Sequence, residues 1–281
     1  MTGAPAGIRL KQWSSLERNG YVCVWFHAEG EEPLWFPPTT PEIDSGEWQY
    51  GGRTENIVNC HLQEIPENGA DVGHLNAVHA PSMVWGSAFG SWTRNKLANF
   101  FFGAHEWSAE WQTDNEDKHV ARISITQNFT LLGLTLIALD LSVRQVGPSL
   151  VLLRFSCPQY NICGLFSQAV MSVASNKQRV IHHIYLKQSI IGRLFSRLML
   201  FGEANMVSTA ETVSQLMTYT CTMMYLPRLQ IDRDCIMWQN KKFLKNPGLV
   251  REEKSIARFR HWFQQFYSAH SPKSFAPLLD W

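Results

Sequence analysis

The densest group of side chains able to do chemistry lies within residues 60–79. Its last sixteen residues hold two imidazoles and three carboxylates, namely His74, His79, Glu64, Glu67 and Asp71. Neutral imidazoles bind Fe(II), Zn(II) or Cu(II), and a carboxylate completes a site suited to oxygen activation on iron. These residue types indicate a candidate metal site, although a histidine packed without any metal is the simpler explanation for either ring taken alone.

The spacing of the two histidines constrains how they converge. Residues five apart on a regular helix are separated by about 140°, so a helix must end or bulge between His74 and His79. Zinc proteases instead use HExxH, whose i, i+4 spacing puts both rings on one face. That motif does not occur here, and neither does a nucleophile elbow, so a zinc hydrolase is disfavoured. Asp71, three residues before His74, is close enough to hydrogen-bond the ring nitrogen not used for metal.

Hydropathy patterns predict the elements that must position these residues. Apolar and polar residues alternate in 121–126 and 137–143, which is typical of half-buried strands. Further strands are predicted at 21–26, 55–62, 149–157 and 180–187, and helices at 66–79, 190–201, 232–244 and 251–270. Adjacent strands with short turns predict one antiparallel sheet, and a sheet followed by helices predicts an α+β fold.

Composition excludes several classes of protein. Hydrophobic residues make up 45% and charged residues 17%, which is typical of a globular chain, and the net charge of +1 disfavours nucleic-acid binding. Six scattered cysteines without a CxxC pair indicate reduced thiols in an intracellular protein. The first thirteen residues lack the apolar core of a secretory signal, and no apolar run reaches the roughly 18–20 residues of a membrane span.

Longer sequence patterns resemble a known family. Glu67-x3-Asp71-x2-His74-x4-His79 is similar to the iron-site signature of Rieske-type non-haem iron oxygenases. Residues 59–71, 234–243 and 260–267 resemble its steroid branch, which includes Neverland-type cholesterol 7-desaturases and bacterial 3-ketosteroid 9α-hydroxylases. Residues 17–25 resemble the closing strand of the Rieske domain, and the resemblance runs from about residue 8 to 268.

The resemblance implies a set of site residues. His74, His79 and Asp234 would hold a mononuclear Fe(II), leaving open positions for O2 beside the substrate. Asp71 would be the carboxylate that carries electrons from a Rieske cluster in a neighbouring subunit. Asp232, about 200° from Asp234 on a regular helix, is expected to be dispensable, as are two other acids, Glu203 and Glu211. The simpler explanation of Asp234 is a solvated acid near a helix N-terminus.

The same resemblance implies a fold and partners. The fold is a curved antiparallel sheet enclosed by helices, of the helix-grip or START-like kind, around an apolar tunnel. Aromatic residues expected as lining, or equally as core, are Phe100, Phe101, Phe102, Trp107, Trp111 and Phe129. The partners implied are a sterol, O2, a reductase that takes electrons from NAD(P)H, and further copies of the chain in a trimer. Membrane association at the endoplasmic reticulum is expected for the intact family member.

The sequence departs from the family in two places. A 2Fe-2S Rieske cluster needs CxH and CxxH pairs, and neither occurs here. Residues 1–38 are therefore interpreted as the end of a Rieske domain, and residues 39–281 as the iron-binding catalytic domain of a truncated form. The second departure is an insertion at about 207–230, which is either a lid over the tunnel or translated non-coding sequence. The missing cluster favours the second explanation.

Two hypotheses about function follow. The first is a sterol oxidoreductase using O2, with 7-desaturation of cholesterol to 7-dehydrocholesterol in steroid hormone biosynthesis as the expected reaction. The alternative is a non-catalytic sterol- or lipid-binding module that keeps the fold but has lost its electron supply. Iron content combined with sterol binding discriminates between them, because a binding module holds sterol whether or not iron is present.

Overall fold

The computed structural model describes residues 12–81, 95–189, 229–241, 248, 253–268 and 270, with backbone alone for 229–232. The predicted helix at 190–201 and the insertion as far as residue 228 lie outside these residues. Among the described residues, helices are α1 (Pro41–Asp44), α2 (Glu64–Glu67), α3 (Val72–Val78), α4 (Lys96–Phe102), α7 (Leu229–Asn240) and α8 (Lys254–Phe263), with short 3₁₀ turns at Pro158–Tyr160 and Gln264–Phe266.

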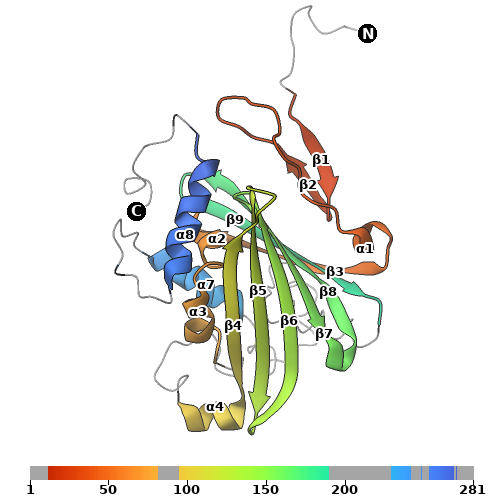
Figure 1. Cartoon of the computed structure of the whole chain (residues 1–281), viewed down its shortest axis with the longest axis vertical. Helices are drawn as coiled ribbons and strands as arrows, with labels where there is room; N and C mark the ends of the chain where they lie inside the picture. Colours follow the sequence, from red (N-terminus) through yellow and green to blue (C-terminus); the bar gives the residue numbers. More distant parts are fainter. Residues whose placement is uncertain are drawn as a thin grey trace, which may run out of the picture.

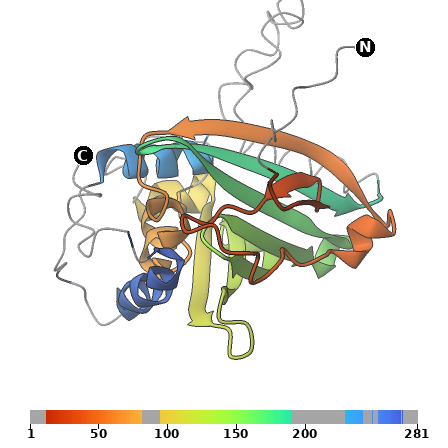
Figure 2. The same cartoon turned by 90° about the horizontal axis from the view of Figure 1, so that it is seen from above.

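Seven long strands form one antiparallel sheet in the order β3-β9-β8-β7-β6-β5-β4. The strands are β3 (Trp48–Val58), β4 (Ala104–Thr113), β5 (Val120–Leu131), β6 (Leu134–Val146), β7 (Leu150–Cys157), β8 (Ile162–Ala174) and β9 (Lys177–Lys187). Strands β4 to β9 follow one another in space as in sequence, and β3 pairs with β9 at the far side. Figures 1 and 2 show a strongly curved sheet with α2, α3, α7 and α8 gathered at one side of it. The α+β prediction is confirmed.

One face of the sheet carries the main core. Trp111, Ile123 and Val143 alternate with exposed residues along their strands and pack against Phe259 and Trp262 of α8. These aromatic side chains bury large apolar areas, at roughly 25 cal/mol per Å², and so hold α8 against the sheet. Trp111 therefore belongs to the packed core rather than to an open tunnel.

The other face is covered in part by the N-terminal segment. A hairpin of β1 (Ser15–Arg18) and β2 (Tyr21–Val24) precedes the sheet. The Tyr21 ring stacks on His183 at 4.2 Å, and its hydroxyl donates to the carbonyl oxygen of Ser167 at 3.1 Å. Trp35 packs with Val146 and Leu150. The boundary expected at residues 38/39 stays a prediction.

Several expectations need adjustment. The single helix expected at 66–79 is two short helices, α2 and α3, separated by a turn. The segments 104–113, 162–174 and 96–102, which the patterns did not predict, form β4, β8 and α4. The described cysteines are free thiols, as expected. Among the described residues, no helix has both the length and the apolar character needed to cross a bilayer.

Candidate metal centre

The helix that carries the first histidine begins with a capped turn. Asp71 is the N-cap of α3, and its carboxylate accepts a hydrogen bond from the backbone N–H of His74 at 3.2 Å. Such caps stabilise a helix by about 1 kcal/mol. The Nδ1–H of His74 is directed to the backbone carbonyl of Asp71 in a short contact. This carbonyl, rather than the expected carboxylate, therefore orients the ring, and it leaves the Nε2 lone pair for a metal.

The second histidine lies where the helix ends. α3 stops at Val78, and His79 is its C-cap, with φ −102° and ψ −3°. The helix thus ends between the two histidines, as their spacing required. The two rings lie 5.1 Å apart between centroids and are nearly perpendicular. The Trp107 indole donates to the carbonyl oxygen of His79 at 3.3 Å, which fixes this end of the helix to β4.

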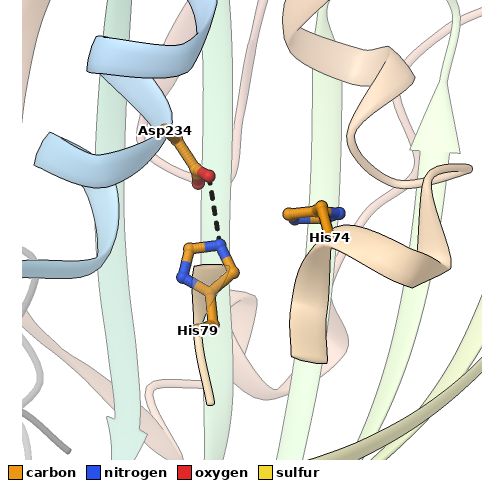
Figure 3. Close-up of side chains that lie close together, drawn as sticks. All are labelled: His74, His79 and Asp234. Atoms are coloured by element: carbon orange, nitrogen blue, oxygen red, sulfur yellow. Dashed lines mark ion pairs between the residues drawn. The ribbon is translucent and has the colours of Figure 1, made fainter. Parts of the chain in front are cut away.

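The third residue comes from a distant part of the chain. Asp234 lies on α7, and its Oδ1 is 3.0 Å from Nε2 of His79 (Figure 3). One donor atom from each of His74, His79 and Asp234 lies within 4.8 Å of the others. All three side chains are buried or partly buried. The structure therefore brings the expected ligand set together across about 155 residues of sequence.

The position of the group in the fold explains how it forms. α3 contacts β4 and α7 contacts β3, the two edge strands of the sheet, and α3 and α7 also contact each other. The three side chains consequently lie where the two edges of the curved sheet are joined by helices. Asn76 of α3 reinforces this arrangement, because its amide exchanges two hydrogen bonds with the backbone of Trp107 at 2.7 and 3.0 Å.

The donor set fits a divalent first-row metal. Ligands at about 2.1 Å and right angles to one another are about 3.0 Å apart, which is the separation of His79 Nε2 and Asp234 Oδ1. Three ligands on one face are all at right angles to one another, so the largest separation, up to 4.8 Å, has to shrink by as much as about 1.8 Å on binding. Burial lowers the pKa of His74, opposed by the charge of Asp234 and assisted by His79. This favours the neutral imidazole that a metal requires.

A buried arginine adjoins the group and was not anticipated. Arg233 is 1% exposed, and its guanidinium donates to the carbonyl oxygens of Val78 at 3.0 Å and Pro81 at 3.3 Å. These carbonyls flank His79, and Val78 ends a helix, where carbonyls lack intrahelical partners. Arg233 thus links the helix that carries Asp234 to the turn that carries His79. No motif could reveal this, because the contacts span more than 150 residues.

Two further histidines are close to the group. Burial lowers the pKa of His105 to about 4, assisted by the charges of Arg233 and His79. Burial likewise lowers the pKa of His182 to about 4, against the opposing charge of Asp234. Both rings are therefore neutral at pH 7. His182 contacts Thr54 and Gln168 through its two nitrogens, at 3.2 and 2.9 Å, so its ring is held as part of the sheet.

The other acids of the expected cluster have a different role. Glu64 and Glu67 are buried and form ion pairs with Lys241 and Arg260. They are structural charges rather than additional ligands in this arrangement. Glu203, Glu211 and the side chain of Asp232 lie outside the described residues.

A separate groove of about 870 Å³ opens on the opposite face of the sheet. Its floor includes Ser108, Thr126, Asp140 and Ser156, which are neighbours across β4 to β7. Side chains of adjacent residues point to opposite faces of a strand, so this row faces away from Trp107 and the histidines. The groove is therefore not the candidate metal centre.

Comparison with known proteins identifies the family. Residues 24–192 and 198–267 match the 3-ketosteroid 9α-hydroxylase C-terminal domain family. The chain belongs to this family. The resemblance to the steroid branch of Rieske-type oxygenases is thus confirmed.

Proteins similar to this chain bear the names of sterol- and steroid-modifying enzymes. The chain is 34% identical over 272 residues to a cholesterol 7-desaturase of Xenopus laevis, covering 96% of this chain and 54% of the relative. It is 33% identical over 273 residues to one of Drosophila melanogaster, covering 96% and 56%. A 3-ketosteroid-9-α-monooxygenase oxygenase component of Rhodococcus rhodochrous is 22% identical over 274 residues, covering 92% and 60%. The chain spans about half the length of the curated relatives it matches.

Solved structures support the fold. Apo dicamba monooxygenase has a TM-score of 0.57 at 10% identity, covering 94% of this chain and 71% of that one. A Pseudomonas putida NdmA mutant with caffeine has a TM-score of 0.52 at 12% identity, covering 99% and 68%. At these identities the likeness concerns the fold alone, and it agrees with the family's curved sheet and helices.

Proposed function

We propose that the chain is the catalytic part of a sterol oxidoreductase whose Fe(II) is held by His74, His79 and Asp234. The observation that carries the proposal is the convergence of these three side chains, with donor atoms within 4.8 Å, in a family named for a steroid hydroxylase. Two imidazoles and one carboxylate on one face are the donors used by non-haem Fe(II) oxygenases.

We further propose cholesterol as substrate and 7-desaturation as reaction, which yields 7-dehydrocholesterol. This is supported by identities of 34% and 33% with cholesterol 7-desaturases, against 22% with the 9α-monooxygenase component. These relatives bear the names of enzymes, which disfavours the alternative of a non-catalytic sterol-binding module.

The residues around the proposed iron site have different roles. When bound, Fe(II) supplies the oxygen-dependent oxidation of an unactivated carbon. The Asp71 carbonyl orients the His74 ring, and Arg233 with Trp107 holds the backbone of His79. Beyond Trp107, the core-facing residues Ile137 and Leu139 pack in the same apolar cluster, which is suited to a sterol and unfavourable to water.

The proposal also includes a source of electrons outside this chain. We infer that Asp71 carries electrons toward His74 from a Rieske 2Fe-2S cluster of a neighbouring subunit, fed by NAD(P)H through a separate reductase. Its place at the start of α3 supports this, because its partly exposed carboxylate lies one turn from a ligand histidine. Residues 1–38 would then be the end of such a cluster domain, and a trimer would supply the neighbour.

Metal binding tests the ligand assignment directly. Anaerobic titration of the chain with Fe(II), and with Co(II) as an optical probe, is expected to saturate at about one ion per chain. Residues that only support a ligand typically alter affinity 10–100-fold, so Asp234→Ala should weaken binding by more than about 100-fold. Asp232→Ala, on the same helix, is the matched control and should bind normally. Equal losses in both variants would refute the assignment.

Turnover tests the reaction. The chain joined to, or supplied with, a Rieske domain and reductase should convert cholesterol to 7-dehydrocholesterol, detected by mass spectrometry of extracted sterols. The chain by itself should bind iron without acid-labile sulfide and should not turn over with reductase and NAD(P)H. Hydroxylated sterol as the main product would refute desaturation while leaving the iron site intact.

A further inference from the structure

Exposed apolar side chains gather at one end of the molecule, on α4 and on the turn between β5 and β6. They are 46–67% exposed and form what we call the apolar end, made of Leu97, Phe100, Phe101, Phe102, Leu132 and Leu134. The backbone N–H of Leu132 donates to the carbonyl oxygen of Phe100 at 2.8 Å, so helix and turn form one unit. Figure 1 shows α4 beside this turn, at the opposite end of the molecule from the β1–β2 hairpin. Exposed apolar patches of this kind mark interaction sites.

The described segments that form the apolar end are almost free of charge. Residues 95–104 and 128–139 include Lys96 as their one charged residue, whereas the chain average of 17% would give about four among 22. They contain no acid. A solvated surface carries more charge, and an acid-free apolar surface can bury its side chains in lipid.

The turn between β5 and β6 carries a leucine at a position where a water-exposed turn usually has asparagine. Leu131 pairs with Leu134, and the two residues between them, Leu132 and Gly133, both have positive φ, 51° and 77°. Turns of this kind favour Asn-Gly, because a bulky residue is strained at positive φ. The other described non-glycine residues with positive φ are all asparagines, at 19, 161 and 176. Leucine thus occupies the one such position that lies in the apolar end, which indicates surroundings other than water.

The apolar end is also continuous with the candidate centre. On the core-facing side, His105, Phe129 and Ile137 are cross-strand neighbours, and Trp107, Gln127 and Leu139 form the next row. Trp107 donates to His79. Leu132 is five positions beyond Gln127, or about 17 Å along the strand at roughly 3.4 Å per residue. This length is close to half of the ~30 Å hydrocarbon core of a bilayer, which is the hydrocarbon thickness of the single leaflet that holds a sterol.

From these observations, we propose that the apolar end inserts into the surface of a phospholipid bilayer and lets a sterol pass from the membrane to the centre. The proposed membrane docking is supported by the exposed apolar side chains, the low charge and the strained Leu132. The proposed passage of a sterol depends in addition on the function proposed above. Because Lys96 is the one charged residue within 95–104 and 128–139, binding depends on apolar insertion rather than on anionic headgroups. Phe100, Phe101 and Phe102 face outward, which replaces the tunnel lining considered from the sequence.

Co-sedimentation with phosphatidylcholine–cholesterol vesicles tests the docking. The chain is expected to bind, with little change when anionic lipid or salt is added. Leu132→Asn should lower the partition coefficient about tenfold, as expected for losing one buried leucine. The same change should leave the melting temperature unchanged or raise it, because asparagine is favoured at this φ. If Leu132 were needed only for folding, its substitution would lower both the partition coefficient and the melting temperature.

A matched control is available at the other end of the sheet. Leu34 is 76% exposed and adjoins Trp35, which packs against Gly147 after β6. Leu34→Asn should leave vesicle binding unchanged. Vesicle binding that is insensitive to Leu132→Asn would overturn the proposal, as would self-association in solution that Leu132→Asn abolishes in the absence of lipid binding. A chain that docks on vesicles but binds no sterol would contradict the proposed function and leave the docking intact.

Discussion

A buried cluster of four charges provides the most quantitative test of how the site is held. Glu67 accepts hydrogen bonds from Arg260 Nε and Nη2, both at 2.8 Å, and from Lys241 Nζ at 2.9 Å. Lys241 also lies 2.6 Å from Glu64. The cluster joins α2 and α8 to the residue that follows α7, the helix of Asp234. Glu67→Gln keeps the shape of the side chain and removes its charge.

The cost of this substitution follows from burial. Glu67 is 3% exposed, and removing one partner of a buried ion pair typically costs 3–5 kcal/mol, because the remaining charges lose their compensation. Burial acts to raise the pKa of Glu67, but Arg260 and Lys241 outweigh it, so the pKa is lowered and this carboxylate is ionised. Burial raises the pKa of Glu64, against the charge of Lys241. Neutralising Glu67 removes a like charge that raises the pKa of Glu64, so Glu64 can take over part of the compensation and we expect the lower end, about 3 kcal/mol.

Urea and thermal unfolding measure the effect. For a chain of this size about 3 kcal/mol corresponds to a fall in melting temperature of roughly 6–12 °C. Glu42→Gln is the matched control, because Glu42 forms a two-bond pair with Arg154, both bonds 2.7 Å, at the surface. Surface pairs contribute about 0–1 kcal/mol. If both variants lose the same small amount, the buried cluster does not hold α2, α7 and α8 together as argued.

Three further predictions concern neighbours of the centre. Asn76→Ala should cost about 1 kcal/mol in urea unfolding, since it removes two hydrogen bonds to the Trp107 backbone, and an unchanged stability would contradict the clamp. The pKa of His182 is about 4 in the folded chain, below ~6.5 in the unfolded chain, so the unfolded state binds the proton first. Because His105 titrates in the same range in both chains, the loss of stability between pH 7 and pH 5 should be about 2 kcal/mol larger in the native chain than in His182→Gln, measured by urea unfolding at both values. Arg233→Met should weaken Co(II) binding about tenfold by releasing the Val78 carbonyl, with Arg233→Lys intermediate, whereas tighter binding would mean that the charge of Arg233 opposes the metal more than its contacts help.

The fold was predictable where one pattern dominated. Residues 121–126 and 137–143 alternate cleanly and lie in β5 and β6, because one face of each strand packs on the core and the other meets water. β8 was missed because its apolar residues do not alternate strictly, as expected for a central strand covered on both faces. The predicted helix at 66–79 is interrupted at Asp71, whose φ of −81° and ψ of 74° are not helical and whose carboxylate caps the second helix.

The site was predictable only in part. The requirement that a helix end between His74 and His79 follows from helical geometry, and α3 does end at Val78. Asp234 came from resemblance alone, because no local spacing relates it to residues so distant in sequence. Its approach to His79 at 3.0 Å agrees with that expectation, while its role as a ligand stays a prediction.

The arrangement of the centre also links metal binding to the fold. His74 and His79 belong to a helix on edge strand β4, and Asp234 to a helix on edge strand β3. A metal bound to all three therefore bridges the two edges of an open sheet, and it binds the folded chain far better than the unfolded one. Ligands that bind the native state stabilise it by about 2.7 kcal/mol at a hundred times their dissociation constant. The contacts of Asn76, Arg233 and the buried charge cluster bring the donors near each other without metal, so folding itself meets part of the cost of assembling the site, and a closure of up to about 1.8 Å remains for metal binding.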